Sequence, residues 1–114
     1  MSATYVSNLI INTYTDFSQI FNLEDTDTNS PLNLVGYAVT SQMRKHAGSS
    51  SATTFESTIY NAASGQIRVG LSTTQTASLK PGRYVYDILL TNPSGEVSRP
   101  IEGMVLVREG VTHL

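Results

Sequence analysis

Cysteine and tryptophan are both absent from this 114-residue chain, and charged residues make up only 14% of it. Without cysteine, the chain cannot form a disulfide framework, a thiolate metal site or a cysteine nucleophile. The charged fraction is well below the quarter or so that is usual in soluble domains. The net charge is −2, and no run of Lys or Arg is longer than Arg44–Lys45. We therefore expect no nucleic-acid partner.

Long hydrophobic runs are absent as well. The apolar stretch Leu9–Ile11 is far too short to span a membrane, and Met1–Tyr5 lack the basic and apolar regions of a signal peptide. We therefore expect a soluble protein that is made in a cytoplasm and has no membrane partner.

Alternating polarity is the strongest signal that is present, and it lies in the middle of the chain. The first alternating segment has an aliphatic face formed by Ile67, Val69 and Leu71. After a polar Ser/Thr-rich connector and a turn at Pro81–Gly82, the second segment has a face formed by Tyr84, Tyr86, Ile88 and Leu90. A period of two residues places each set on one side of a strand. These sets are the predicted centre of the core.

Similar segments on both sides of this centre predict the remaining strands. They are residues 8–14, 17–23, 34–43, 55–60 and 96–108. Loops are predicted at 24–31, 47–52, 61–65 and 92–95, and no convincing amphipathic helix is found. About seven short strands separated by turns favour an all-β, antiparallel immunoglobulin-like β-sandwich. Because cysteine and tryptophan are missing, it is not a disulfide-pinned antibody-type domain.

The chain is predicted to be a single domain, residues 1–114, with short arms at about 1–8 and 108–114. Tyr5 lies in the first arm, where we expect a neighbouring subunit to order it. In the strand at 34–43, alternation places Val35, Tyr37, Val39, Ser41 and Met43 on one side. Residues 47–52 should form a hairpin loop, and 55–60 the return strand, with Phe55, Ser57 and Ile59 inward.

An acidic turn is the sharpest candidate for a metal site. Asp25, Asp27 and Asn29 have the spacing of the first three ligands of a calcium loop. The sixth and twelfth positions of such a loop require glycine and glutamate, but here they hold Ser30 and Gly36. We therefore expect a solvated turn without calcium.

No residue pattern indicates catalysis. His46 and His113 lack partners at metal-ligand or catalytic spacing, and no serine lies in a G-x-S-x-G motif. Asp87 is the exceptional carboxylate, since it lies between apolar residues of a predicted strand. We expect it to form a surface salt bridge with Arg68 or Arg83; the alternative is a polar anchor between subunits. The sequence thus predicts no enzyme, and no catalytic, cofactor-binding or metal residues.

The six tyrosines could form a sugar-binding platform or a protein interface. They are Tyr5, Tyr14, Tyr37, Tyr60, Tyr84 and Tyr86. For the co-facial pair Tyr84 and Tyr86, packing in the core is the better interpretation.

Several motifs follow one another in an order that covers residues 12–112. They are Leu32–Tyr37, Gln42–Lys45, SGQIRVGLS at 64–72, GRYVYDI at 82–88 and Gly103–Val107. This succession resembles the immunoglobulin-like N-terminal domains of tailed-phage baseplate upper proteins and related short virion proteins. Such domains pair a G-x-I-x-L-x-L strand with a G-x-Y-x-Y-D strand. The resemblance implies a structural, non-enzymatic role in a virion, with no catalytic residue to carry over.

The expected function is therefore that of a structural subunit of a tailed-phage particle, which joins or stabilises tail, neck or baseplate components. Its expected partners are other phage structural proteins, with several copies in a symmetric assembly and no small-molecule substrate. Two alternatives stay open: a decoration subunit of the capsid surface, and a free carbohydrate- or peptide-binding β-sandwich.

Overall fold

The computed structural model describes residues 5–25 and 28–114, and these residues form nine strands and one short helix. The elements are β1 (Tyr5–Val6), β2 (Leu9–Asn12), β3 (Phe17–Asn22), β4 (Ala38–Arg44), β5 (Thr53–Thr54), β6 (Glu56–Asn61), β7 (Gln66–Leu71), α1 (Thr73–Ala77), β8 (Gly82–Thr91) and β9 (Val97–Arg108). No helix in this part of the chain is long and apolar enough to cross a membrane.

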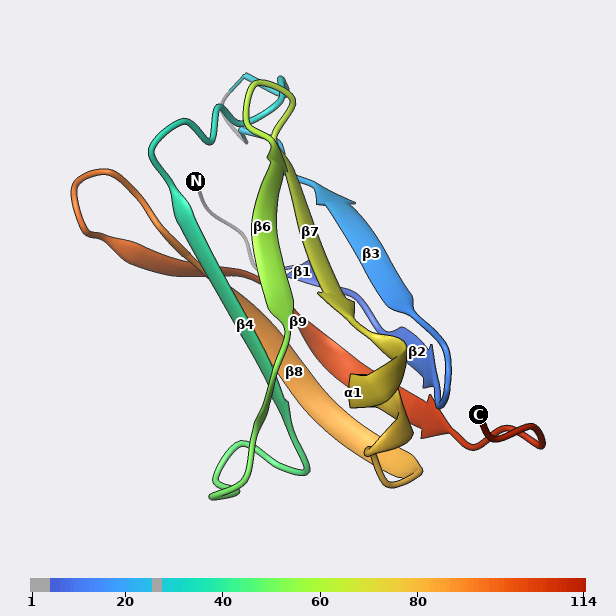
Figure 1. Ribbon diagram of the computed structural model, residues 1–114. Coiled ribbons are helices and arrows are strands. Elements are labelled where there is room, and N and C mark those ends of the chain that lie inside the picture. The colour runs from blue at the N-terminus through green and yellow to red at the C-terminus, as the bar shows by residue number, and fades with distance from the viewer. Residues whose placement is uncertain (1–4, 26–27) are drawn as a thin grey trace.

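The strands form two sheets that face each other (Figure 1). The larger sheet has the order β1-β9-β8-β4-β5, with β2 also paired to β9, and the smaller has the order β3-β7-β6. In a seven-stranded immunoglobulin domain, the second, fifth and fourth strands oppose the third, sixth and seventh. Here β3, β7 and β6 oppose β4, β8 and β9 in the same arrangement. The predicted all-β immunoglobulin-like sandwich is confirmed. Pairing is antiparallel except for β1 and β2, which run parallel to β9.

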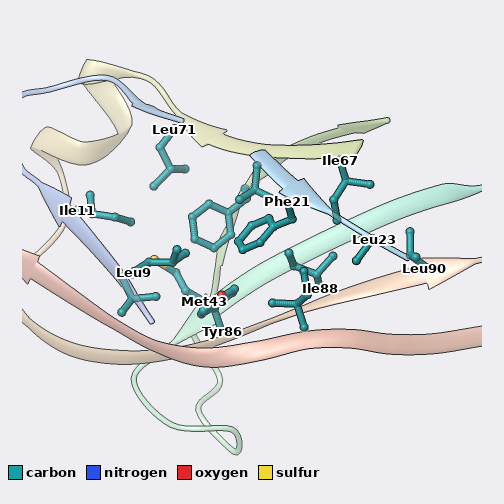
Figure 2. Close-up of a cluster of buried hydrophobic side chains, with 14 of the residues drawn as sticks. Leu9, Ile11, Phe21, Leu23, Met43, Ile67, Leu71, Tyr86, Ile88 and Leu90 are labelled. Atoms are coloured by element: carbon teal, nitrogen blue, oxygen red, sulfur yellow. The ribbon is translucent and has the colours of Figure 1, made fainter. Parts of the chain in front are cut away.

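The core lies between the sheets, and the predicted strand faces line it (Figure 2). Ile67, Val69, Ile88 and Val105 are fully buried, and Leu90 is only 1% exposed. These residues alternate with more exposed neighbours in most strands. The alternation in the sequence therefore predicted the buried strand faces correctly.

Aromatic rings pack against one another between the two sheets, which antibody-type domains join by a disulfide. The ring of Phe55 lies 6.1 Å from that of Phe17, and 6.3 Å from that of Tyr86 in an edge-on arrangement. Such pairs stabilise a core beyond the burial of their area. This cluster links the two sheets without a covalent bond.

The predicted polar connector after β7 contains the helix α1. Ser72 caps it: its hydroxyl accepts from the Gln75 amide, and the Gln75 side chain accepts from the Ser72 amide. This capping box stabilises a helix too short to show an amphipathic pattern. Just beyond α1, the phenol of Tyr84 donates to the Lys80 carbonyl at 2.7 Å. In immunoglobulin domains, a tyrosine near the start of the strand that corresponds to β8 typically forms this hydrogen bond.

Three strand predictions need correction. Strand β4 begins at Ala38, because a turn with Gly36 at φ +82° precedes it, and Val35 is 66% exposed rather than on the inner side. Only β5 returns along β4; the chain then crosses at Phe55, so β6 pairs with β7 in the other sheet. The motif strands β7 and β8 also lie in different sheets and do not pair.

The N-terminal segment is held by the chain itself. Within the described part of the predicted arm, Tyr5 and Val6 pair with Ile101 and Glu102 of β9, so no neighbouring subunit is needed to order Tyr5. Residues 1–4 lie outside the described part. At the other end, β9 stops at Arg108, and 109–114 form no strand.

Candidate functional site

The outer face of the larger sheet, formed by the sides of β4, β8 and β9 that point away from the core, is the strongest candidate for a functional surface. Strand alternation brings side chains of all three strands onto it, because Val85 lies opposite Arg44 on one side and Met104 on the other. An open hollow of about 680 Å³ lies on this face. Its lining includes Gln42, Arg44, Asp87, Arg99, Glu102 and Met104.

An apolar strip crosses the outer face near the N-terminal strands. It consists of Ile10, Met104 and Leu106, which are 54%, 48% and 40% exposed. Ile10 and Leu106 are register partners in β2 and β9, so their side chains are neighbours. Exposed apolar residues that adjoin one another are typical of interaction sites, whereas isolated ones are not.

Arginines border this strip. Arg44, Arg83, Arg99 and Arg108 occupy outward positions, compared with two carboxylates, Asp87 and Glu102. The face is therefore basic in a chain whose net charge is −2. Methionine and arginine next to an apolar centre are enriched in protein–protein interfaces.

Asp87 lies in the hollow, and its ion pair differs from the predicted one. Its Oδ2 is 3.0 Å from the Arg99 Nε, with the two side chains 37% and 53% exposed. The predicted surface salt bridge is confirmed, but neither predicted partner forms it. Arg68 lies on the smaller sheet and donates to the Ser18 hydroxyl at 2.9 Å, and Arg83 lies opposite Leu106.

Arg44 also lines the hollow, and hydrogen bonds hold it in place. Its guanidinium donates to the Ser49 carbonyl and to the Gln42 Oε1, the latter at 3.1 Å. Since these bonds fix the side chain before any partner arrives, less rotamer entropy is lost on binding.

The described residues of the acidic turn are bonded to one another. The Asn29 amide donates to the Asp25 carbonyl, and the Asp25 amide to the Ser30 carbonyl, both at 2.8 Å. Asp27 lies outside the described residues. Over the residues that are described, no group of three or more His, Cys, Asp or Glu could hold a metal.

The two histidines have different surroundings. His46 is an exposed loop residue that lines part of the hollow. His113 stacks on Tyr14, with ring centroids 4.7 Å apart, and its Nε2 is 3.7 Å from a Glu109 carboxylate oxygen.

The predicted packing of Tyr84 and Tyr86 in the core is confirmed. Tyr86 is 4% exposed, and burial raises the pKa of its phenol above the ordinary value of 10.0. Tyr5 and Tyr60, at 51% and 58% exposed, lie on different sheets and form no shared platform.

Arg99 and the apolar strip were not predicted from the sequence. The signal was present in β9, where Met104 and Leu106 alternate with the buried residues Val105 and Val107. Two apolar residues at successive outward positions, Met104 and Leu106, are the signal that an outer face is used.

Comparison with known proteins gives structural likeness only. No family model matches the chain, and no curated protein matches it. Among solved structures, it is similar to the SrpA adhesin (R347E mutant) from Streptococcus sanguinis, with a TM-score of 0.51 and 15% identity over 94% of this chain and 56% of the adhesin chain.

Two further structures match less well. The internalin-like protein lmo2027 of Listeria monocytogenes has a TM-score of 0.46 and 13% identity, over 94% of this chain and 28% of that one. Murine CRIg has a TM-score of 0.42 and 13% identity, over 90% and 92%. The chain thus spans about half, or less, of the two bacterial proteins. At 15% identity, the likeness to the adhesin extends to the fold alone.

Proposed function

We propose that this chain is a non-enzymatic structural subunit that binds neighbouring proteins through the outer face of its larger sheet. The observation that carries the proposal is the apolar strip of Ile10, Met104 and Leu106 with arginines along its border. An apolar centre loses water on binding, and the arginines around it supply hydrogen bonds and orientation.

The assembly we propose is a tailed-phage particle, in which the chain joins or stabilises tail, neck or baseplate components. The support is the sequence of motifs at 64–72 and 82–88, which resembles phage virion domains. Several copies would occupy equivalent positions, and each would present the same outer face to a neighbouring structural protein.

Copy number in purified particles tests this proposal. Quantitative mass spectrometry would compare this chain with the major capsid protein of the same particles. A count equal to a small multiple of the tail symmetry supports the proposal. A count that matches the capsid lattice would instead favour a decoration subunit, and complete absence would overturn the virion proposal.

A second candidate is a free module that binds a peptide or carbohydrate. The observation that favours it is the open hollow, where Asp87 and Arg99 offer an acceptor and a donor beside Met104. Binding of a glycan or peptide library member that is lost in Arg99→Ala, together with absence from particles, would establish this alternative.

A further inference from the structure

Strand β3 forms an open edge of the smaller sheet (Figure 1). It pairs with β7 over its whole length, from Phe17 opposite Leu71 to Asn22 opposite Gln66. No other strand in the described part of the chain pairs with it. Its second edge is therefore available to another strand.

The backbone groups on that edge can be identified. The Leu23 amide donates to the Gly65 carbonyl at 2.8 Å, so Leu23 and every second residue before it bond toward β7. Ser18, Ile20 and Asn22 therefore point their amides and carbonyls to the open edge. The Gln19 side chain reaches the Ile20 carbonyl at 3.2 Å, which agrees with this orientation.

This edge lacks the features that protect other edges. Natural edge strands are blocked by charged residues, proline or bulges, and the sequence FSQIFN of β3 contains no charge and no proline. Strand β6, at the opposite edge of the same sheet, contains Glu56 and has a register shift between Ile59 and Asn61. The contrast indicates that the β3 edge is kept open.

We propose that β3 pairs antiparallel with β3 of a second copy of this chain. The two-fold axis would pass midway between the two copies of Ile20. Opposite residues of an antiparallel pair lie on the same face of the sheet. A residue must therefore lie opposite its own copy if the inner faces of the two chains are to form one continuous face. With the axis at Ile20, the edge-facing residues pair completely: Ile20 lies opposite Ile20, and Ser18 opposite Asn22. An axis at Gln19 would instead place Asn22 opposite Asp16, outside the strand.

An acidic residue flanks β3 at each end. The carboxylate of Asp16 accepts hydrogen bonds from the Thr73 amide and hydroxyl at 2.9 and 2.8 Å, so it is already bound to α1. At the other end, the backbone of Glu24 forms an isolated antiparallel β-bridge with that of Pro31. The paired segment itself is neutral, but just beyond it this register places Asp16 of one copy opposite Glu24 of the other. A second copy of the chain also presents the same unpaired edge of β3.

This inference deepens the proposed function and rests on it, since it names one contact between copies in the assembly. It uses the smaller sheet, and the outer face of the larger sheet remains available for other partners. The two would therefore join different neighbours.

Sedimentation of the purified chain across a wide range of concentrations tests the pairing. We expect a dimer, and we expect Ile20→Lys to raise its dissociation constant about tenfold or more, because two lysines would lie directly opposite each other. The matched control is Tyr60→Lys on β6, where the side chain is 58% exposed, and it should leave the dimer unchanged. A chain that stays monomeric, or a dimer unaffected by Ile20→Lys, would overturn the pairing.

Hydrogen exchange of the unmodified chain keeps the test valid if Ile20→Lys does not fold. Rising concentration should slow exchange of the Ser18, Ile20 and Asn22 amides and leave those of β6 unchanged. Equal exchange at all concentrations would contradict the pairing. The two proposals fail separately, because a monomer in solution leaves the copy number in particles unaffected, and absence from particles leaves a solution dimer intact.

Discussion

The phenol of Tyr86 donates a hydrogen bond to the Ser7 carbonyl, 2.6 Å away and 79 positions earlier in the chain. It joins β8 to the segment between β1 and β2, which lies on the far side of β9. Gly103 in β9 makes the close approach possible, because a Cβ there would lie 2.2 Å from the same carbonyl oxygen. The N-terminal strands that carry Ile10 onto the outer face thus depend on these residues.

Replacing Tyr86 by phenylalanine tests this link. Tyr86→Phe keeps the ring against Phe55 and removes the donor to Ser7. We expect the free energy of unfolding to fall by about 1–2 kcal/mol, since a partly buried carbonyl loses its partner. Urea unfolding measures this as a lower midpoint with an unchanged slope. Tyr60→Phe, at a 58% exposed residue, is the control and should stay within about 0.5 kcal/mol.

The same residue makes stability depend on alkaline pH. Burial raises the pKa of Tyr86 in the folded state above 10.0, near which the unfolded chain releases the proton. Between the two pKa values the folded state binds more protons than the unfolded state, so the free energy of unfolding falls as pH rises above about 10. Urea unfolding on both sides of that pH should show a smaller loss for Tyr86→Phe than for the unmodified chain. An equal loss in both would contradict the assignment to Tyr86.

Adding a methyl group at Gly103 should displace the N-terminal strands. In Gly103→Ala the new Cβ meets backbone atoms of Ser7, which cannot move aside as a flexible side chain would. We expect a loss of about 1–3 kcal/mol in the free energy of unfolding and faster hydrogen exchange in β1 and β2. Gly110→Ala, with nothing closer than 3.9 Å, is the matched control. A Gly103→Ala chain as stable as this control would refute the close contact.

The core faces could be predicted because each depends on local alternation. Ile67, Val69 and Leu71 must share a face in any strand that contains them, whatever pairs with it. The crossing at Phe55 could not be predicted in this way, since Phe55 faces inward both in a return strand and in a strand of the other sheet. Alternation specifies which side of a strand is buried, and it does not specify the neighbouring strand.

The other differences also come from contacts distant in sequence. The helix α1 was missed because its five residues are held by the capping box of Ser72 and Gln75 rather than by an apolar face. The partner of Asp87 was missed because the β8–β9 hairpin, with its register shift after Ile88, brings Arg99 beside it. Pairing of β1 and β2 with β9 likewise joins the two ends of the chain, which no local pattern reports.

The most direct test of the proposed binding face is competition between Met104→Glu and the unmodified chain for incorporation into particles. Met104 is 48% exposed, so the substitution should leave the fold stable while placing a charge in the apolar strip. We expect the variant to be depleted about tenfold or more, as for a residue at the centre of an interface. Tyr60→Glu, at a 58% exposed residue of β6 in the smaller sheet, is the control and should be incorporated normally. Equal incorporation of Met104→Glu and the unmodified chain would contradict binding through the outer face.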